Sequence, residues 1–313
     1  MSRTVALTGA SGFVGSHVAA RLVAEGWRVR ALSHSRALDP ATDGLTPIPG
    51  ALDDRESLVE LVRGADAVVH CAGLVRASSK AEFAAVNTAG TARLAAVAAS
   101  LTPPPRFILM SSLAARAPAL SAYASSKRAA EEALAGMKRA LPWAALRPPA
   151  VYGPGDTATL GFFRQIRFGV AAVPACPKAR FSLIYVADLA AAVAAALMAP
   201  VTNGSILEVR DDRADGYTWP DVAGIAAREL GRRAVSVPVP RGFMRIVAAV
   251  NVAACAATGR APMVTPGKVR ELFHPDWVCS DNPLVRLTDW TPQVAVGDGF
   301  ARTIAWYRRQ GWL

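Results

Sequence analysis

Cysteines and long apolar runs are scarce in this chain, and each scarcity excludes a class of protein. Only four of the 313 residues are cysteines, and none forms a CxxC pair or a cysteine–histidine spacing that would bind a metal. We therefore expect no metal site and no disulfide scaffold. The sequence enters a predicted strand at once, without the charged and apolar segments of a secretory signal, so the cytoplasm is the expected compartment.

Acidic residues are also few, because 24 Asp and Glu stand against 35 Lys and Arg, a formal net charge of +11. A basic surplus favours anionic partners such as a phosphorylated cofactor or a membrane surface. The basic residues are scattered, however. The chain has no Lys/Arg run interleaved with aromatic residues of the kind that is typical of nucleic-acid-binding proteins. The sequence therefore predicts no nucleic-acid partner.

The first half of the chain alternates short apolar runs with alanine-rich stretches whose apolar residues recur at helical spacing. The predicted strands are 4–7, 28–32, 67–70, 106–110 and 144–146. The predicted helices are 14–25, 57–62, 81–100 and 122–140. Strands and helices in such alternation, with short connections, predict an α/β fold with a doubly wound parallel sheet covered on both faces.

A glycine-rich turn follows the first predicted strand and opens the first predicted helix. Gly9 permits the tight turn, Gly12 leaves room for a pyrophosphate against the backbone, and Gly15 lets the helix lie close to the sheet. The flanking strand and helix distinguish this turn from a purely structural one, and the helix N-terminus would face the phosphates. The predicted cofactor contacts here are Gly9, Ser11, Gly12, Phe13, Val14 and Gly15.

Further segments resemble one enzyme family. They are His70-Cys71-Ala72-Gly73, Asn87-Thr88-Ala89-Gly90-Thr91, Tyr123-x-x-x-Lys127 and Arg147-Pro148-Pro149-Ala150-Val151-Tyr152-Gly153-Pro154-Gly155. From about residue 3 to about residue 200 the chain resembles the extended short-chain dehydrogenases/reductases, nearer the 3β-hydroxysteroid dehydrogenase and ketoreductase-like members. The resemblance adds Cys71, Ala72, Gly73, Pro149 and Val151 to the expected cofactor contacts.

The alternation breaks after residue 149, where glycines and prolines become frequent. The strand at 181–185 and the helix at 188–198 are expected to return to the sheet. We therefore predict an NADP-binding Rossmann domain at 1–153, joined by about 180–200, and a smaller, interleaved C-terminal substrate lobe. That lobe would comprise about 154–179 and 201–313.

The end of the second predicted strand bears on which nicotinamide nucleotide binds. Ser33 stands where the family's NAD-selective aspartate would bind the free ribose, and His34 and Arg36 follow. The missing carboxylate and a guanidinium favour a 2′-phosphate, so NADP(H) is preferred, with NAD(H) as the alternative if Arg36 is only a solvated loop residue. Asp53, after Leu52, either contacts the adenine, as the resemblance implies, or caps the next helix.

Tyr123 and Lys127 stand four apart on a predicted helix and so share one face. A neighbouring ammonium would lower the pKa of the phenol and allow general acid–base catalysis. The resemblance implies that Lys127 also binds the nicotinamide ribose and that Ser112 holds the reacting oxygen. Ser111 is the alternative, and the family's pattern favours the second serine of the pair. Asn87 is either an orienting amide or a structural one.

The C-terminal half carries two clues to the substrate. Phe181 occupies the place of an arginine that binds phosphates in sugar-nucleotide enzymes of the family, and Arg180 is one residue away. A shift of one residue on a strand reverses the face, which disfavours such a substrate. The apolar segment 242–258 is either a helix buried in the lobe or a peripheral membrane contact, with 162–168 as a second rim. The basic residues that would face lipid headgroups are Arg241, Arg245, Arg260, Lys268 and Arg270.

These observations favour an NADPH-dependent ketoreductase, or hydroxyl dehydrogenase in reverse, acting on a hydrophobic 3-oxo substrate. A steroid-like ketone or the keto form of a sphingoid lipid or ceramide is the most specific expectation. The alternatives are a nucleotide-diphosphate-sugar epimerase, dehydratase or reductase, and a non-catalytic accessory subunit that binds the cofactor. By resemblance, helices 81–100 and 122–140 would form a homodimer interface, and the enzyme would be cytoplasmic or at the inner face of the membrane.

Overall fold

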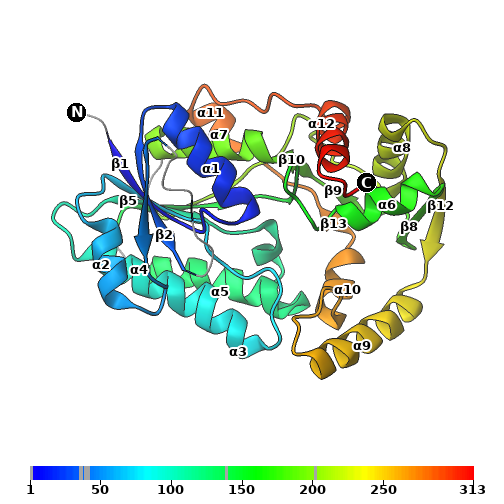
Figure 1. Ribbon diagram of the computed structural model, residues 1–313, viewed down its shortest axis with the longest axis horizontal. Helices are drawn as coiled ribbons and strands as arrows, with labels where there is room; N and C mark the ends of the chain where they lie inside the picture. Colours follow the sequence, from blue (N-terminus) through cyan, green and yellow to red (C-terminus); the bar gives the residue numbers. More distant parts are fainter. Residues whose placement is uncertain (1–2, 35–37, 39–42, 138–139, 201–202) are drawn as a thin grey trace.

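Seven parallel strands form the centre of the computed structural model, which describes residues 3–34, 38, 43–137, 140–200 and 203–313 (Figure 1). Their order is β11-β6-β5-β4-β1-β2-β3, and each neighbouring pair is parallel. The strands are β1 (Thr4–Thr8), β2 (Arg28–Ser33), β3 (Leu45–Pro49), β4 (Ala67–His70), β5 (Arg106–Met110), β6 (Trp143–Arg147) and β11 (Ser205–Glu208). The doubly wound α/β fold is confirmed.

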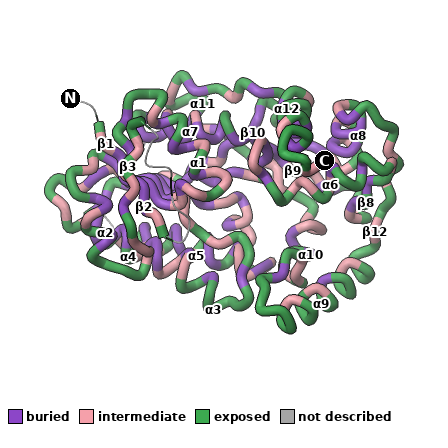
Figure 2. The backbone as a smooth tube through the Cα atoms, viewed as in Figure 1, coloured by how far each residue is buried: buried purple, intermediate pink, exposed green. Residues whose placement is uncertain are grey.

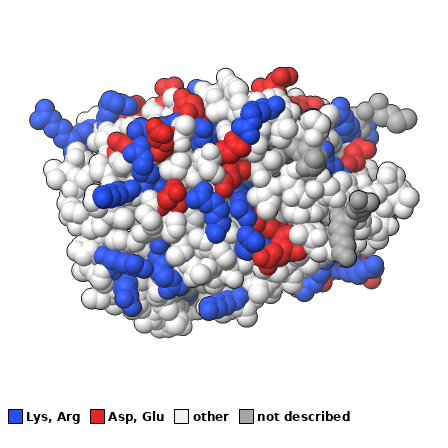
Figure 3. All heavy atoms as spheres, turned by 180° about the vertical axis from the view of Figure 1, so that it is seen from behind, with Lys and Arg blue, Asp and Glu red and all other residues white. Residues whose placement is uncertain are grey.

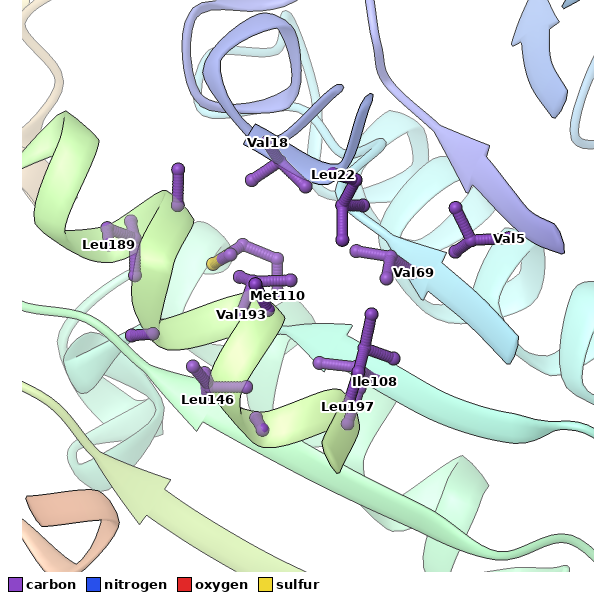
Figure 4. Close-up of a cluster of buried hydrophobic side chains, with 14 of the residues drawn as sticks. Val5, Val18, Leu22, Val69, Ile108, Met110, Leu146, Leu189, Val193 and Leu197 are labelled. Carbon is purple, nitrogen blue, oxygen red and sulfur yellow. The ribbon is translucent and has the colours of Figure 1, made fainter. Parts of the chain in front are cut away.

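Helices cover both faces of this sheet, because successive strand residues point to opposite sides and both sides are apolar. On one side, α1 (Phe13–Ala24) and α7 (Val186–Met198) pack against each other and the sheet (Figure 4). On the other side lie α2 (Arg55–Val62), α4 (Gly90–Ala99) and α5 (Ala122–Gly136). Val5 and Leu7 of β1 belong to the first core and Ala6 to the second, as the alternation requires.

The predicted helix 81–100 is confirmed, but one turn within it is irregular. It consists of α3 (Lys80–Phe83), a π-helical turn (Ala84–Ala89) and α4. A π turn inserts an extra residue into a helix and is common at functional sites. Here it carries Asn87, whose side chain is buried.

The expectation that strand 181–185 returns to the central sheet is wrong. Its residues form β9 (Arg180–Phe181) and β10 (Leu183–Tyr185), which pair with β13 (Asp276–Trp277) and β7 (Ala150–Tyr152) outside the sheet. The helix α7 does cover the sheet, and the chain then enters it as β11, beside β6. Helix α7 packs its apolar residues against α1 on one face of the sheet. The segment that follows α7, and not the one before it, then pairs with β6 at the edge of the sheet.

The other edge strand, β3, was not among the predicted strands. Pro47 and Pro49 interrupt its pattern. Proline lacks the amide hydrogen that a central strand must donate, so it is tolerated at an edge such as this one. Among the described strands β3 pairs with β2 alone, as expected of a strand at the edge of the sheet.

A third apolar cluster holds the remaining elements together, as the purple segments at the right of Figure 2 show. It includes Phe163, Tyr217, Phe300 and Tyr307. Most of its residues come from β7, β10, α6 (Leu160–Arg167), β8 (Val170–Pro174), α8 (Trp219–Leu230) and α12 (Val296–Arg309), and β12 (Val235–Val239) pairs with β8. The short helix α11 (Pro283–Leu287) instead packs beside α7, where Leu284 joins the core of the sheet.

Helix α9 (Arg241–Thr258) lies at the edge of the molecule and packs against α10 (Pro266–Leu272) (Figure 1). All of its residues are described, and only Ala248 is buried. The alternative of a helix buried in the lobe is therefore wrong. Among the described residues, no helix is long and apolar enough to cross a membrane.

Candidate active site

The segments expected to bind the cofactor all follow strands that end at one edge of the sheet. Thr8, His70, Met110 and Arg147 are the last residues of β1, β4, β5 and β6. Ligands of doubly wound folds bind at this carboxyl edge, because the loops that follow the strands converge there.

The glycine-rich turn between β1 and α1 is closely packed. Gly9 has a φ of +76°, and a Cβ on it would lie 2.6 Å from the amide nitrogen of Ala72. A Cβ on Gly15 would lie 2.0 Å from the carbonyl oxygen of Gly9. Neither position therefore accepts a side chain without movement of the backbone.

The start of α1 has the chemistry that a pyrophosphate requires. Gly12 is the N-cap residue, no side chain of the described residues caps the helix, and its first turn carries no acidic residue. The helix dipole and the first amide groups are thus left to an anionic ligand. Gly12 itself is less crowded, since a Cβ there would lie 3.2 Å from the Gly9 carbonyl oxygen. The predicted contacts Ser11, Phe13 and Val14 flank it.

The adenine end of the expected site lies after β2 and β3. Ser33 ends β2 opposite Pro49, and His34 is exposed, whereas Arg36 lies outside the described residues. The helix cap of α2 is Asp54, whose carboxylate accepts a backbone amide at 3.0 Å. The alternative that Asp53 caps this helix is therefore wrong, and its carboxylate is exposed.

Leu52 precedes these aspartates and is partly buried. It packs against α4, since a Cβ on Gly90 would lie 3.0 Å from a Leu52 methyl carbon. A side chain at Gly90 would thus press on Leu52, where the loop after β3 approaches the helix.

A chain of buried hydrogen bonds ties the glycine turn to the π turn. The ring of His70 bonds the Thr8 hydroxyl at 2.6 Å and the Thr91 hydroxyl at 3.0 Å. Thr91 in turn donates to the Asn87 carbonyl oxygen at 2.6 Å. Burial, followed by the charge of Lys127, lowers the pKa of His70 to about 3, so the ring is neutral. Neutral imidazole can accept at one nitrogen and donate at the other, as this chain requires.

The Asn87 side chain links three segments of the site. Its amide accepts from the Leu74 nitrogen at 2.7 Å, donates to the Leu74 carbonyl at 3.0 Å and donates to the Ser126 hydroxyl at 2.9 Å. Ser126 lies on α5 and donates to the Tyr123 carbonyl at 2.8 Å. Asn87 thus holds the loop after β4 against the helix of Tyr123 and Lys127.

The structure brings Ser112, Tyr123 and Lys127 to one place. Ser112 lies near enough to Tyr123 to lower the pKa of the phenol, and its hydroxyl accepts the Ala114 amide at 3.2 Å. The buried Lys127 donates from Nζ to the Met110 carbonyl at 2.9 Å. A Cβ on Gly73 would lie 3.2 Å from Nζ, so this glycine leaves space beside the ammonium.

The neighbouring Ser111 points elsewhere. Its hydroxyl donates to Glu131 at 2.5 Å, and Glu131 also accepts from Arg147 at 2.8 Å. Glu131 and Arg147 form a buried ion pair between α5 and β6. The two adjacent serines therefore have different surroundings: Ser111 bonds the ion pair between α5 and β6, and Ser112 lies beside the phenol.

The pKa of Tyr123 differs from the expectation. Burial raises it to about 12, the hydrogen bond from Ser112 lowers it, and the negative charge of Glu271 raises it. Burial also lowers the pKa of Lys127 to about 8, against the charges of Cys71 and Glu131. The net pKa of the phenol is therefore raised and not lowered, because desolvation of the hydroxyl outweighs the contributions that stabilise the phenolate.

Glu271 is a residue of this site that sequence reasoning missed. It lies on α10, is buried, and accepts hydrogen bonds from Ser121 and, at 3.0 Å, from Lys268. Ser121 caps α5, the helix of Tyr123. The sequence gives one signal for Glu271: residues 231–270, directly before it, contain no acidic residue.

Arg180 and Phe181 are both engaged within their own lobe. Arg180 donates to the carbonyl oxygens of Asp215 at 2.7 Å and Gly216 at 3.2 Å. Phe181 packs on Trp219 with ring centroids 4.7 Å apart. In this arrangement the guanidinium binds backbone carbonyls of a loop.

No group of three metal-binding side chains occurs in the described parts of the chain. All four cysteines are free thiols. Cys279 is buried, and Cys71, Cys176 and Cys255 are partly buried.

Comparison with known proteins assigns the family. Residues 5–209 match the NAD dependent epimerase/dehydratase family. The chain belongs to this family. Its glycine turn and its Tyr-x-x-x-Lys helix lie in the matched region, and it is an NAD(P)-dependent oxidoreductase of the extended short-chain dehydrogenase/reductase type.

Individual relatives divide between two substrate classes. Ceramide reductase of Caulobacter vibrioides is 39% identical over 99% of this chain and 96% of its own. Among solved structures, MoeE5 with UDP-glucuronic acid and NAD has a TM-score of 0.76 at 23% identity, covering 99% and 100% of the two chains. UDP-glucuronic acid 4-epimerase from Bacillus cereus has a TM-score of 0.74 at 18% identity, covering 98% and 99%. These structures share the fold.

Proposed function

We propose that this enzyme is an NADPH-dependent ketoreductase that reduces a hydrophobic 3-oxo lipid, with an oxidised ceramide as the preferred substrate class. The observation that carries the proposal is the placement of Ser112 beside Tyr123, on the helix that also carries the buried Lys127. The phenol is protonated at neutral pH and can donate its proton to a carbonyl oxygen. The 39% identity to a ceramide reductase along nearly the whole chain supports the lipid.

The nicotinamide ring, when bound, supplies a hydride to the carbonyl carbon. Ser112 donates a hydrogen bond to the carbonyl oxygen, where negative charge develops. Tyr123 transfers its hydroxyl proton to that oxygen, which completes the alcohol and leaves a phenolate. Lys127 would stabilise this phenolate and hydrogen-bond the ribose of a bound cofactor, and one proton from solvent would return to Tyr123. The product alcohol thus gains the hydride at carbon and the Tyr123 proton at oxygen.

The residues that would hold the cofactor fit a dinucleotide. The close glycine turn and the uncapped start of α1 suit the pyrophosphate. The preference for NADP(H) is supported by Ser33, which provides no carboxylate to repel a 2′-phosphate. We expect Ser33→Asp to reduce the ratio of NADPH to NADH affinity at least about tenfold, measured by fluorescence titration, and Ser100→Asp to leave it unchanged.

A sugar-nucleotide epimerase is the second candidate, since the fold neighbours include an epimerase. The engagement of Arg180 with loop carbonyls disfavours it, because the guanidinium would have to leave these partners to bind phosphates. The third alternative was a non-catalytic accessory subunit that binds the cofactor. The membership of the chain in an enzyme family disfavours it.

The decisive experiment follows NADPH oxidation by the purified enzyme with detergent-dispersed 3-oxo lipids and, separately, with UDP- and GDP-sugars. The proposal requires turnover of the lipid ketone and its loss in Tyr123→Phe. Turnover of a sugar nucleotide without turnover of any apolar ketone would overturn it.

We also propose a homodimer formed through α4 and α5, which pack side by side on one face of the sheet. Their alanines allow close approach of a second pair of helices. Native mass spectrometry at twice the mass of the chain supports the dimer, and a monomer at micromolar concentration contradicts it.

A further inference from the structure

We propose that α9 docks the enzyme on the surface of an anionic membrane and that its apolar face enters the headgroup region. The route of the substrate described below rests on the proposed lipid ketone, whereas the docking itself does not. The argument starts from the exposure of this helix.

One face of α9 is apolar and open to solvent. Phe243, Ile246 and Val250 are 59%, 64% and 63% exposed, and Val247 beside them is 38% exposed. Their spacing of three, four and seven residues places them in one stripe along the helix. Soluble proteins rarely leave a contiguous stripe of large apolar residues in water, and such a stripe marks a contact surface.

Two residues outside the apolar stripe secure α9 to the molecule. Ala248 is buried, and the Asn251 side chain accepts the Val264 amide at 3.1 Å. The helix packs against α10. Its apolar stripe is therefore held in a fixed direction, facing away from the lobe.

Charge favours a membrane over a second copy of the chain. Residues 231–270 contain seven Arg and Lys and no Asp or Glu. In the view from behind, the lower left of the surface, where α9 lies, shows blue and white spheres and no red ones (Figure 3). A symmetric contact between two such faces would bring like charges together, whereas anionic lipid headgroups attract them. An apolar stripe on a helix whose opposite face carries basic residues, here Arg241 and Arg245, is typical of helices that lie in the membrane interface.

The next helix connects this surface to the catalytic residues. Arg270 of α10 donates to the Leu120 carbonyl at 2.7 Å, and Glu271 accepts from Ser121. These contacts lie directly before Tyr123 on the chain. A lipid that leaves the bilayer beside α9 would therefore meet the wall of the catalytic site within the length of α10, without crossing water as a free molecule.

The test is flotation of the cofactor-bound protein with phosphatidylcholine vesicles, with and without phosphatidylglycerol. We expect binding only to the anionic vesicles, weakened by salt. The variant Phe243→Ser/Ile246→Ser/Val250→Ser should bind at least about tenfold less. Its matched control is Val59→Ser/Ile206→Ser/Leu287→Ser, three exposed apolar residues on other elements, and it should bind as the wild type.

The charge contribution is tested in the same assay. Arg241→Gln/Arg245→Gln/Arg260→Gln should lose binding to anionic vesicles at moderate salt. The control Arg21→Gln/Arg63→Gln/Arg286→Gln removes the same charge from exposed sites elsewhere and should retain binding.

Activity separates this proposal from the proposed function. With a detergent-dispersed ketone the triple serine variant should keep the wild-type rate within about twofold, and with the ketone embedded in anionic vesicles it should be at least about tenfold slower. Docking is overturned if the wild type does not float with anionic vesicles, if the serine variant floats equally, or if that variant converts a dimer to a monomer. Absence of turnover with any lipid ketone, alongside intact flotation, overturns the proposed function alone.

Discussion

Ser111 and Ser112 directly follow β5, and the two adjacent residues have different roles. Ser111 bonds the buried Glu131–Arg147 pair, and Ser112 lies beside the Tyr123 phenol. Consecutive residues leaving a strand point in opposite directions, so only one of them can face the cofactor side. The chemistry of both side chains is the same, and their surroundings alone distinguish them.

The serine pair therefore provides a matched test. We expect Ser112→Ala to lower kcat about 10²- to 10³-fold, because it removes a donor to the developing oxyanion. Ser111→Ala should instead cost about 1–2 kcal/mol of the free energy of unfolding, because buried Glu131 loses a hydrogen bond. Steady-state kinetics and urea unfolding of both variants measure this, and the reverse assignment of effects would contradict it.

The buried lysine sets a pH dependence. The pKa of Lys127 is lowered to about 8, so its ammonium is present below that pH and is lost as the pH rises through it. The Tyr123 phenol stays protonated throughout this range, since its pKa is about 12. We expect kcat/KM for NADPH, which reports the free enzyme, to be constant below about pH 8 and to fall above it. A profile that is flat to about pH 10, near the ordinary lysine pKa, would contradict the shift.

At the scale of elements, α10 joins the substrate lobe to the catalytic helix α5. Glu271 of α10 accepts from Ser121, the cap of α5, and from Lys268. The Trp277 ring nitrogen donates to the Glu271 carbonyl at 2.8 Å. The position of α10 is thus fixed by polar contacts at the site itself.

Removal of this carboxylate should loosen the junction. We expect Glu271→Ala to lower the free energy of unfolding by about 1–3 kcal/mol, because the buried Ser121 hydroxyl loses its partner. Glu132→Ala, on the exposed side of α5, should change it by less than about 0.5 kcal/mol. Urea unfolding midpoints compare the two variants, and equal losses would show that Glu271 does not hold the junction.

At the scale of the whole molecule, the C-terminal part is built into the core of the sheet. Leu284 and Trp290 belong to the same apolar cluster as α1 and α7, and the Trp290 ring donates to the Asp188 carbonyl at 3.2 Å. After the segments that form the lobe, the chain thus packs against the sheet again. This contact couples the C-terminal lobe to the Rossmann domain.

This coupling predicts a single unfolding transition. Far-UV circular dichroism and tryptophan fluorescence should report the same midpoint, and NADPH at about 100 times its Kd should add about 2.7 kcal/mol to the free energy of unfolding. Two separate midpoints, of which NADPH moves only one, would show that the lobes unfold independently.

Much of this architecture could be predicted because its signals are local. The glycine turn, the Tyr-x-x-x-Lys spacing and five of the seven central strands each depend on residues that are close together in the sequence. Local sterics and periodicity determine them. β3 and β11 were missed because proline at an edge and a strand of four residues leave almost no periodic signal.

Local sequence by itself determined the alternating strands and helices and the order of the reactive side chains along the chain. Tertiary structure alone decided which segment completes the sheet, that burial raises the pKa of Tyr123, and that Glu271 lies near enough to affect it. These features depend on contacts between residues distant in sequence and on desolvation by the packed surroundings, neither of which is encoded in any short stretch of chain. The exposure of α9 is of the same kind, because an apolar helix is buried or open according to what packs against it.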